Sequence, residues 1–375
     1  MLRGSSAEVC VGKFQQRGTM QTRLSFNRAV FARCIVNRLC VLLPAKDERL
    51  GISKTLTSIL HAGVHPLDIY MIDDGSSDGT GEIARSFGVN VLRNPKNTGK
   101  ALALSRGARE FDVVNRYDYV RLMDADTEVC ESYFAAVERA FSDKSVAAVC
   151  GRAKSTPHNW LTAYRCLAYW MSHAIYKGGQ SNMGVITVTP GCASSFRADV
   201  FSKLDWNTDT IVEDMDCTIQ IHRQKLGRIV YQKDAVVSTQ DPRTIRDYIK
   251  QIYRWDTGTW QIGQKYGMAS GLSKIDWEFK LLMGEGLMFS TLYLLLPVLL
   301  PICPRIALYG TGIDFLVLVM LAFICAIRER RTDVITALPT YEVLRFVDCS
   351  VLLYSFWKTV IKRKQVRGWF AVKRY

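Results

Sequence analysis

The sequence predicts an α/β sheet domain followed by a membrane region of apolar helices. From Leu39 to about Tyr231, short β-rich runs alternate with helical patterns, which is typical of α/β proteins. After Phe279 the chain becomes strongly apolar. Its 375 residues allow one large domain or two modest ones. We therefore expect a basic arm at residues 1–38, an α/β domain at residues 39–270 and a membrane region at residues 271–375.

The α/β domain is expected to begin with a buried strand that ends at Pro44. A Gly/Ser turn at residues 75–79 follows the second strand and leads into a helix. The expected strands are Leu39–Leu43, Asp68–Ile72, Val89–Leu92, Tyr119–Met123, Val146–Cys150 and Gly184–Thr189. The expected helices are Ile52–His61, Gly81–Phe87, Ala101–Asn115, Val212–Lys225 and Ile245–Tyr266.

Two stretches of the membrane region are long enough to cross a bilayer. Residues 281–303 contain Glu285 as their only charged residue, and residues 306–327 contain only Asp314. Arginines follow the second stretch, so the positive-inside rule favours a cytoplasmic α/β domain and a multi-pass membrane protein. In residues 341–361 four charged side chains interrupt the apolar pattern, which favours an interfacial helix; a third span is the alternative.

The charge balance of the chain indicates an anionic partner. The formal net charge is +14 and the pI is about 9.3, while the mean hydropathy of +0.02 is high for 22% charged residues. No nucleic-acid motif accompanies the basic residues, so membrane lipid or a phosphorylated substrate is expected instead. The eleven cysteines show no metal-finger spacing and fit reduced, buried thiols in a cytosol-facing protein.

The first 38 residues are rich in arginine and contain a single acid, Glu8. They lack the apolar core of a secretory signal peptide. A basic arm that touches anionic lipid is the expected role, with an organelle transit peptide as the alternative. Met20 offers an alternative start.

Asp124 and Asp126 follow the apolar run Tyr119–Met123. Residues i and i+2 of an extended segment point the same way, and ligands of open α/β sheets bind beyond the carboxyl ends of the strands. Two carboxylates there suit Mg²⁺ or Mn²⁺, which takes further ligands from phosphates and water and acts as a Lewis acid on a leaving diphosphate. Taken alone, this D-x-D pair is more often a surface turn.

Asp73 and Asp74 also end an apolar strand. They suit hydrogen bonds to a nucleotide base or ribose, although, for these two residues taken alone, an Asx turn is the better explanation. Glu213 and Asp214 open a predicted helix, where the helix dipole alone favours acids. In a functional interpretation Asp214 is a general base that takes a proton from an acceptor hydroxyl.

Gln251, Arg254 and Trp255 lie on one face of a predicted helix, at positions i, i+3 and i+4. Arginine binds phosphate and tryptophan packs against a sugar ring, whereas a core or lipid-facing tryptophan is the structural alternative. The four motifs occur in a fixed order before an apolar tail. Together they predict transfer of a sugar from a nucleotide diphosphate at a membrane surface.

The chain resembles the membrane-bound family 2 glycosyltransferases, the branch with cellulose, chitin, hyaluronan and poly-N-acetylglucosamine synthases. The resemblance covers about residues 39–266. The D, D-x-D, E-D and Q-x-x-R-W motifs of that family are similar to Asp73/Asp74, Asp124/Asp126, Val212-Glu213-Asp214 and Gln251/Arg254/Trp255 of this chain. The resemblance implies a GT-A nucleotide-sugar domain and inversion by single displacement. It also implies Asp214 as base, Asp126 as main metal ligand, Asp124 as a ribose or metal contact, and Trp255 at the acceptor sugar.

Three further segments match this family. Pro44-Ala45-Lys46-Asp47-Glu48 resembles the nucleotide-contacting P-x-x-N-E loop, with Asp47 in place of the usual Asn. Asn97-Thr98-Gly99-Lys100 resembles the N-x-G-K segment, which implies Lys100 near the base or phosphates. The loop from Gly191 and Cys192 to Arg197 resembles the acceptor-side loop.

Several alternatives remain open at this stage. No clear span precedes Leu39, which favours single transfer to a lipid or protein acceptor over processive polymer synthesis. A non-catalytic membrane scaffold is a further alternative. A dinucleotide-dependent oxidoreductase is disfavoured because no G-x-G-x-x-G follows the first strand. A UDP-sugar is the expected donor, but the sugar, the acceptor and the oligomeric state, including a homo-oligomer, stay open.

Overall fold

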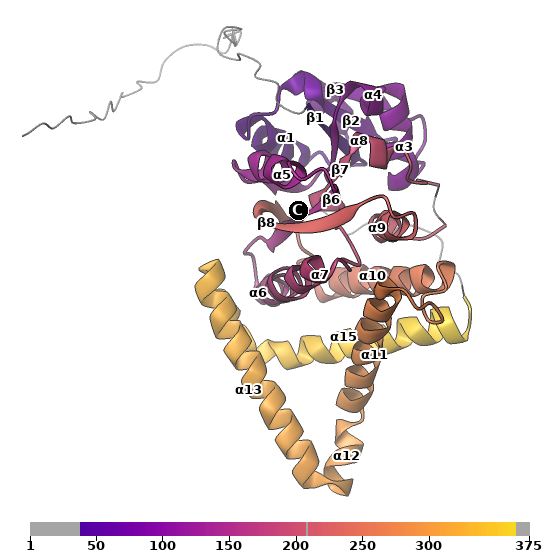
Figure 1. The fold of residues 1–375 in the computed structure, drawn as a ribbon. Helices are drawn as coiled ribbons and strands as arrows, with labels where there is room; N and C mark the ends of the chain where they lie inside the picture. The colour runs from indigo at the N-terminus through magenta and orange to yellow at the C-terminus, as the bar shows by residue number, and fades with distance from the viewer. Residues whose placement is uncertain (1–37, 208, 365–375) are drawn as a thin grey trace, which may run out of the picture. The chain divides into compact units, whose positions relative to one another are not determined.

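The computed structural model describes residues 38–207 and 209–364 (Figure 1). Its centre is a mixed sheet in which the strands follow the order β3-β2-β1-β4-β7-β6-β8-β5. The strands are β1 (Leu39–Ala45), β2 (Ile69–Asp73), β3 (Asn90–Arg93), β4 (Tyr119–Leu122), β5 (Thr127–Val129), β6 (Val146–Ser155), β7 (Ser194–Arg197) and β8 (Arg228–Thr239). The predicted α/β class is confirmed. The basic arm predicted at residues 1–38 lies, apart from Arg38, outside the described residues.

The first half of the sheet is parallel. β1 pairs in parallel with both β2 and β4, and β2 pairs in parallel with β3, whereas β7 runs antiparallel to β4 and β6. The carboxyl ends of β1, β2 and β4 therefore lie at one edge of the sheet. The acidic motifs that follow these strands are collected at that edge.

Helices cover both faces of the sheet because side chains alternate along each strand. In β1, Val41 and Leu43 face one core cluster, and Cys40 and Leu42 face the other. On the first face lie α1 (Ile52–His61), α2 (Thr80–Ser86) and α5 (Tyr133–Phe141). On the second lie α3 (Lys100–Glu110), α4 (Val113–Arg116), α8 (Ala198–Phe201) and α9 (Glu213–Arg223).

A second helical layer carries the C-terminal part of the chain. It consists of α6 (Trp160–Trp170), the π-helix η2 (Met171–Lys177), α7 (Gly178–Met183), α10 (Ile245–Lys265), α11 (Lys274–Leu294), α12 (Leu296–Ile302), α13 (Pro304–Glu329), α14 (Asp333–Thr336), α15 (Tyr341–Phe356) and a final π turn, η5 (Trp357–Ile361). Short 3-10 turns lie at η1 (Pro66–Asp68), η3 (Gly191–Ala193) and η4 (Leu338–Thr340). Residues of α6, α10, α13 and α15 share one apolar cluster.

Among the described helices, α13 alone is long and apolar enough by itself to cross a membrane, with a mean hydropathy of 2.3 over its best window. The other expected span, residues 281–303, is broken: α11 and α12 meet at a 63° bend and pass the same test only as a pair. Pro297 lies in the first turn of α12. A proline there interrupts the preceding helix, and its missing N–H costs α12 nothing because the first N–H groups of a helix have no partner within it.

The segment predicted as an interfacial helix or third span forms α15 and η5, and α15 packs against α10 and α11. Its charged side chains have protein partners. Arg345 pairs with Asp314 of α13 at 2.6 Å, Tyr293 donates to Glu342, and Asp348 accepts from two tyrosine hydroxyls. These partners explain how a helix with four charges packs within an apolar layer.

Two strand predictions are wrong. Gly184–Thr189 has no regular structure, although its β-branched residues favour a strand. Side chains of other elements, and not a neighbouring strand, form the hydrogen bonds of its backbone. Lys177 donates to the carbonyl of Val188, the Thr189 amide donates to Thr218, and a ring nitrogen of His222 bonds the Ile186 carbonyl.

Pro44 does not end the first strand; β1 continues to Ala45. The Ala45 carbonyl points to β2, so Pro44 points to the β4 side, where pairing already stopped at Leu42. Proline lacks a backbone N–H, but at this position that N–H would have no partner in β4, so no hydrogen bond between the strands is lost.

The predicted helix Ala101–Asn115 is two helices, since Asp112 takes a left-handed conformation with φ of 52°. The buried thiols are as expected: Cys40, Cys150, Cys166 and Cys217 are free and buried.

Candidate active site

Lys100 is the centre of the candidate site. It is the first residue of α3, and its side chain is 18% exposed. Its Nζ lies 2.6 Å from Oδ1 of Asp124 and 3.0 Å from Oε1 of Glu213. Burial opposes the charged form, but these carboxylates, together with Asp214, raise the pKa of Lys100 above its ordinary value. Residues from the N-x-G-K, D-x-D and E-D segments thus meet at one ammonium group.

Asp214 lies beside this ion cluster at the start of α9. Its Oδ2 accepts the amide of Gly191 at 3.0 Å, and its Oδ1 accepts the amide of Met215 at 2.8 Å. Burial and the neighbouring Glu213 raise the pKa of Asp214, while Lys100 and the two amides oppose that rise. A carboxylate that is buried yet kept ionisable by a nearby cation has the properties of a general base.

Gly191 allows the acceptor-side loop to approach Lys100. A Cβ at this position would lie 2.6 Å from Nζ of Lys100 and 3.8 Å from Oδ2 of Asp214. Any larger residue would displace the ammonium group, so glycine matters here because of this contact and not because of its backbone conformation.

Arg121 is a residue of this site that the sequence analysis missed. It is fully buried in β4, and its guanidinium donates to the carbonyls of Ser194 at 2.7 Å and Cys192 at 2.6 Å. Its Cζ lies 4.5 Å from the centre of the Tyr133 ring. Burial lowers the pKa of Arg121. A charged residue in an otherwise apolar strand was the available signal, and the structure explains it: Arg121 fastens the Gly191–Ser194 turn to the strand that precedes the D-x-D pair.

Asp124 and Asp126 follow β4 directly. The Asp124 side chain is 31% exposed, and Oδ1 of Asp126 accepts from the Thr127 hydroxyl at 3.4 Å. In residues 38–207 and 209–364, no group of three or more His, Cys, Asp or Glu side chains is placed to hold a metal ion. Asp124 and Asp126 are the candidate protein ligands for a divalent cation, and Mg²⁺ or Mn²⁺ would take phosphate and water as further ligands there.

Asp73 and Asp74 are buried and already bonded to backbone. Asp74 accepts from the Thr98 amide and hydroxyl, from the Gly99 amide at 2.8 Å and from Asn94 at 2.7 Å. Asp73 accepts from the Ser76 amide at 2.8 Å. These contacts favour a structural role for both residues, as in an Asx turn. Asp74 also holds the backbone of residues 98–99, which immediately precedes Lys100.

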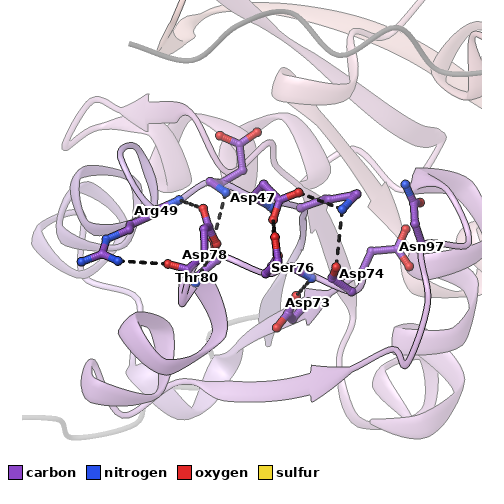
Figure 2. Close-up of polar contacts among 12 residues, drawn as sticks. Asp47, Arg49, Asp73, Asp74, Ser76, Asp78, Thr80 and Asn97 are labelled. Carbon is purple, nitrogen blue, oxygen red and sulfur yellow. Dashed lines mark hydrogen bonds and ion pairs between the residues drawn. The ribbon is translucent and has the colours of Figure 1, made fainter.

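The opening loop after β1 is fastened to the 76–80 turn (Figure 2). The amides of three consecutive residues, Asp47 to Arg49, donate to the side chains of Ser76, Thr80 and Asp78 respectively. Asp47 has φ of 53°, a left-handed conformation that Asn and Asp tolerate best. Asp therefore serves at this position as Asn would. Glu48 is buried, and Pro44 lies in β1.

Gln251, Arg254 and Trp255 share one face of α10 as predicted, and Trp255 packs against α6. The Arg165 guanidinium lies 4.8 Å from the Trp255 ring centre and pairs with Asp241 at 3.3 Å. No described residue donates to Oε1 of Gln251, which is buried.

Part of the chain is similar to known proteins. Residues 40–205 match the family model described as Glycosyl transferase family 2. Over this segment the chain is similar to the family 2 glycosyltransferases.

Two curated relatives bear the name poly-beta-1,6-N-acetyl-D-glucosamine synthase. The protein of Staphylococcus epidermidis strain RP62A is 28% identical over 243 residues, which are 62% of this chain and 58% of that protein. That of Staphylococcus aureus strain COL is 28% identical over 224 residues, 58% of this chain and 53% of that protein. The chain thus spans little more than half the length of these relatives.

Among solved structures, a mannosyltransferase of Pyrobaculum calidifontis in complex with GDP-Man and Mn²⁺ is similar with a TM-score of 0.59. At 18% identity this likeness supports the fold alone, which is GT-A-like. It covers 86% of this chain and 88% of that chain, a share that extends beyond the α/β domain and includes helices after α10.

Proposed function

We propose that this protein is an inverting glycosyltransferase that moves a sugar from a nucleotide-sugar donor, expected to be a UDP-sugar, to an acceptor hydroxyl. One observation carries the proposal: Nζ of Lys100 bridges Asp124 and Glu213 at 2.6 and 3.0 Å, with Asp214 beside it. Charged residues far apart in sequence are half-buried together. Holding them out of water costs free energy, and such clusters are frequent at functional sites.

In the proposed reaction Asp214 accepts the proton of the acceptor hydroxyl. The hydroxyl oxygen attacks the anomeric carbon, the bond from that carbon to the diphosphate oxygen breaks, and the nucleoside diphosphate leaves with the bonding electrons. The configuration at the anomeric carbon is inverted. The raised pKa of Asp214 supports this role, since a base is more effective when its pKa is nearer the working pH.

Asp124 and Asp126 would hold Mg²⁺ or Mn²⁺ together with the donor phosphates. When bound, the ion supplies Lewis-acid stabilisation of the leaving diphosphate. Lys100 contributes a fixed positive charge at the same place, and Asp74 positions it through the Thr98 and Gly99 amides. Pro44, Glu48 and Asp73 are proposed to shape the loops beside the nucleotide, Asp73 through its bond to the Ser76 amide.

The acceptor is proposed to lie between the Gly191–Cys192 loop and α10. A sugar hydroxyl would supply the donor that Oε1 of Gln251 lacks among the described residues. Arg254 would bind the diphosphate and Trp255 the acceptor ring. The names of the curated relatives favour a growing polysaccharide as acceptor. Transfer of single sugars to a lipid or protein is the second candidate, and a non-catalytic scaffold the third.

We further propose a multi-pass membrane location with the catalytic domain on the cytoplasmic face. The apolar helix α13 and the bent α11–α12 pair support this topology.

The test is nucleotide release by the detergent-purified chain. UDP-glucose, UDP-N-acetylglucosamine, UDP-galactose and GDP-mannose are offered separately with Mg²⁺ or Mn²⁺, beside Asp126→Ala. Metal-dependent release from one donor, abolished in the variant, is expected. If no donor is bound or turned over, the enzyme proposal is wrong. Donor binding without turnover would indicate a missing acceptor. Product length then separates polymer synthesis from single transfer.

A further inference from the structure

A cavity of about 520 Å³ lies between two groups of helices in the second half of the chain. One wall is formed by α6, η2, α7 and the segment at residues 187–188, and the other by α11, α13 and α15. Half of the sixteen lining residues have apolar side chains, and apolar atoms make up most of the accessible surface of the wall. Its apolar side chains include Leu167, Met171, Val188, Leu282, Leu318 and Leu321.

The lining of this cavity suits a hydrocarbon chain better than a polysaccharide. A glycan needs polar partners for its hydroxyls, which aliphatic side chains do not provide. The wall also includes Leu318 and Leu321 of α13, the helix whose composition fits a membrane and whose most apolar 18-residue window is only 11% buried within the protein. The outer surface of α13 is therefore available to lipid, and the cavity lies against its inner side.

Lys177 places a positive charge in this cavity. The residue is 4% exposed, and its Nζ donates to the carbonyl of Val188 at 2.6 Å. Within residues 38–207 and 209–364, no carboxylate lies at ion-pair distance from it. Arg345, the other cation of the lining, differs because it pairs with Asp314. A buried ammonium group without a counter-ion is costly, so an anionic ligand is expected there.

The backbone around Lys177 gives an independent indication. Met171–Lys177 is a π-helix, a rare conformation that occurs frequently at functional sites. It brings Met171, Tyr176 and Lys177 to the cavity from one short segment.

We propose that this cavity binds an anionic membrane lipid, with a hydrocarbon chain along the aliphatic wall and the headgroup phosphate at Lys177. The site is coupled to the candidate active site through the chain itself. Val188, which accepts from Lys177, precedes Gly191 by three residues, at most about 11 Å of chain, and Gly191 donates to Asp214. The bound lipid stabilises the segment that carries the acceptor-side loop.

The experiment is photo-crosslinking of the full chain in neutral detergent. The probes are phosphatidylglycerol and phosphatidylcholine that each carry a diazirine in one acyl chain, and the labelled peptides are located by mass spectrometry. Lys177→Met removes the charge, and Lys177→Arg retains it. Ala168→Phe fills the cavity. Lys280→Met is the matched control, because Lys280 likewise donates to a carbonyl, that of Gly271 at 2.8 Å, but does not line the cavity.

In the unmodified chain, phosphatidylglycerol should label peptides of α6, η2 and α13 more strongly than phosphatidylcholine. Lys177→Met should lower phosphatidylglycerol labelling about tenfold, the loss of one charge-assisted contact. Lys177→Arg and Lys280→Met should retain it, and Ala168→Phe should lower labelling by both lipids.

Three outcomes would overturn the proposal. Labelling confined to the outer surfaces of α11 and α13 would indicate lipid around the protein only. Equal labelling of Lys177→Met and the unmodified chain would remove the headgroup site. Displacement of the probe by a soluble N-acetylglucosamine oligomer, or by inorganic phosphate alone, would assign the cavity to a different ligand. The readout is binding, so it does not depend on transferase activity.

Discussion

Gly191→Ala tests the packing of the candidate site at its tightest point. The added Cβ would lie 2.6 Å from Nζ of Lys100, whereas ordinary contact begins at 3.4 Å. The end of a lysine side chain is flexible, so Nζ should withdraw by about 0.8 Å rather than the backbone shift. This movement lengthens at least one of its ion pairs, with Asp124 or Glu213.

The expected cost follows from the electrostatics. Lengthening an ion pair from 2.6 Å by about 0.8 Å weakens it by roughly 1.5 kcal/mol at an effective dielectric constant of about 20. If the displaced Lys100 charge costs the same energy in the transition state, the rate falls about tenfold, and misplacement of an acceptor near the loop increases the loss to about 100-fold. Since only a side-chain end moves, the melting temperature should change by less than about 2 °C.

The assay is nucleotide release per folded molecule, with melting temperature measured on the same samples. Gly179→Ala is the matched control: it lies in α7, and a Cβ there meets no atom within 4 Å. That variant should keep its rate and be as stable or slightly more stable. Full activity in Gly191→Ala, or equal losses in both variants, would refute the proposed contact between the acceptor-side loop and Lys100.

Three further predictions concern charged residues. In Lys100→Met the cation that lowers the pKa of Asp214 is gone, so that pKa rises and the acid limb of kcat/KM should move to higher pH; an unmoved limb contradicts the assignment of Asp214. Asp74→Ala should lower the free energy of unfolding by about 3 kcal/mol in urea titrations, because it removes the acceptor of the buried Asn94 side chain and of the part-buried Thr98 and Gly99 amides; loss of donor affinity at unchanged stability would instead support a direct nucleotide contact. Arg345→Met should destabilise the protein by about 3 kcal/mol, and the double change with Asp314→Leu should recover most of it; additive losses would show that the pair is not formed.

Local patterns predicted much of the fold correctly. The helix Ile52–His61 has the predicted bounds, and the predicted Ile245–Tyr266 ends one residue earlier in the structure. Both helices are amphipathic, so their periodicity alone defines them. The segment Gly184–Thr189 failed because its partners are side chains of η2 and α9, which no local pattern reveals.

In the candidate site, too, local motifs were predictable and contacts between distant residues were not. Lys100, Asp124, Glu213 and Asp214 were named from motifs, and the structure places them together. Arg121 was missed because its partners are carbonyl groups more than seventy positions later in the chain. Lys177 was missed because its significance lies in burial without a carboxylate, a property of the packed molecule only.

The most direct test of the central claim is the effect of Asp214→Asn on binding and transfer measured separately. The change keeps the shape of the side chain and removes the base. Donor affinity should stay within about threefold of the unmodified protein, whereas transfer should fall at least about 100-fold. Transfer at the full rate by Asp214→Asn would contradict the assignment of the base and, with it, the mechanism built on the Lys100 cluster.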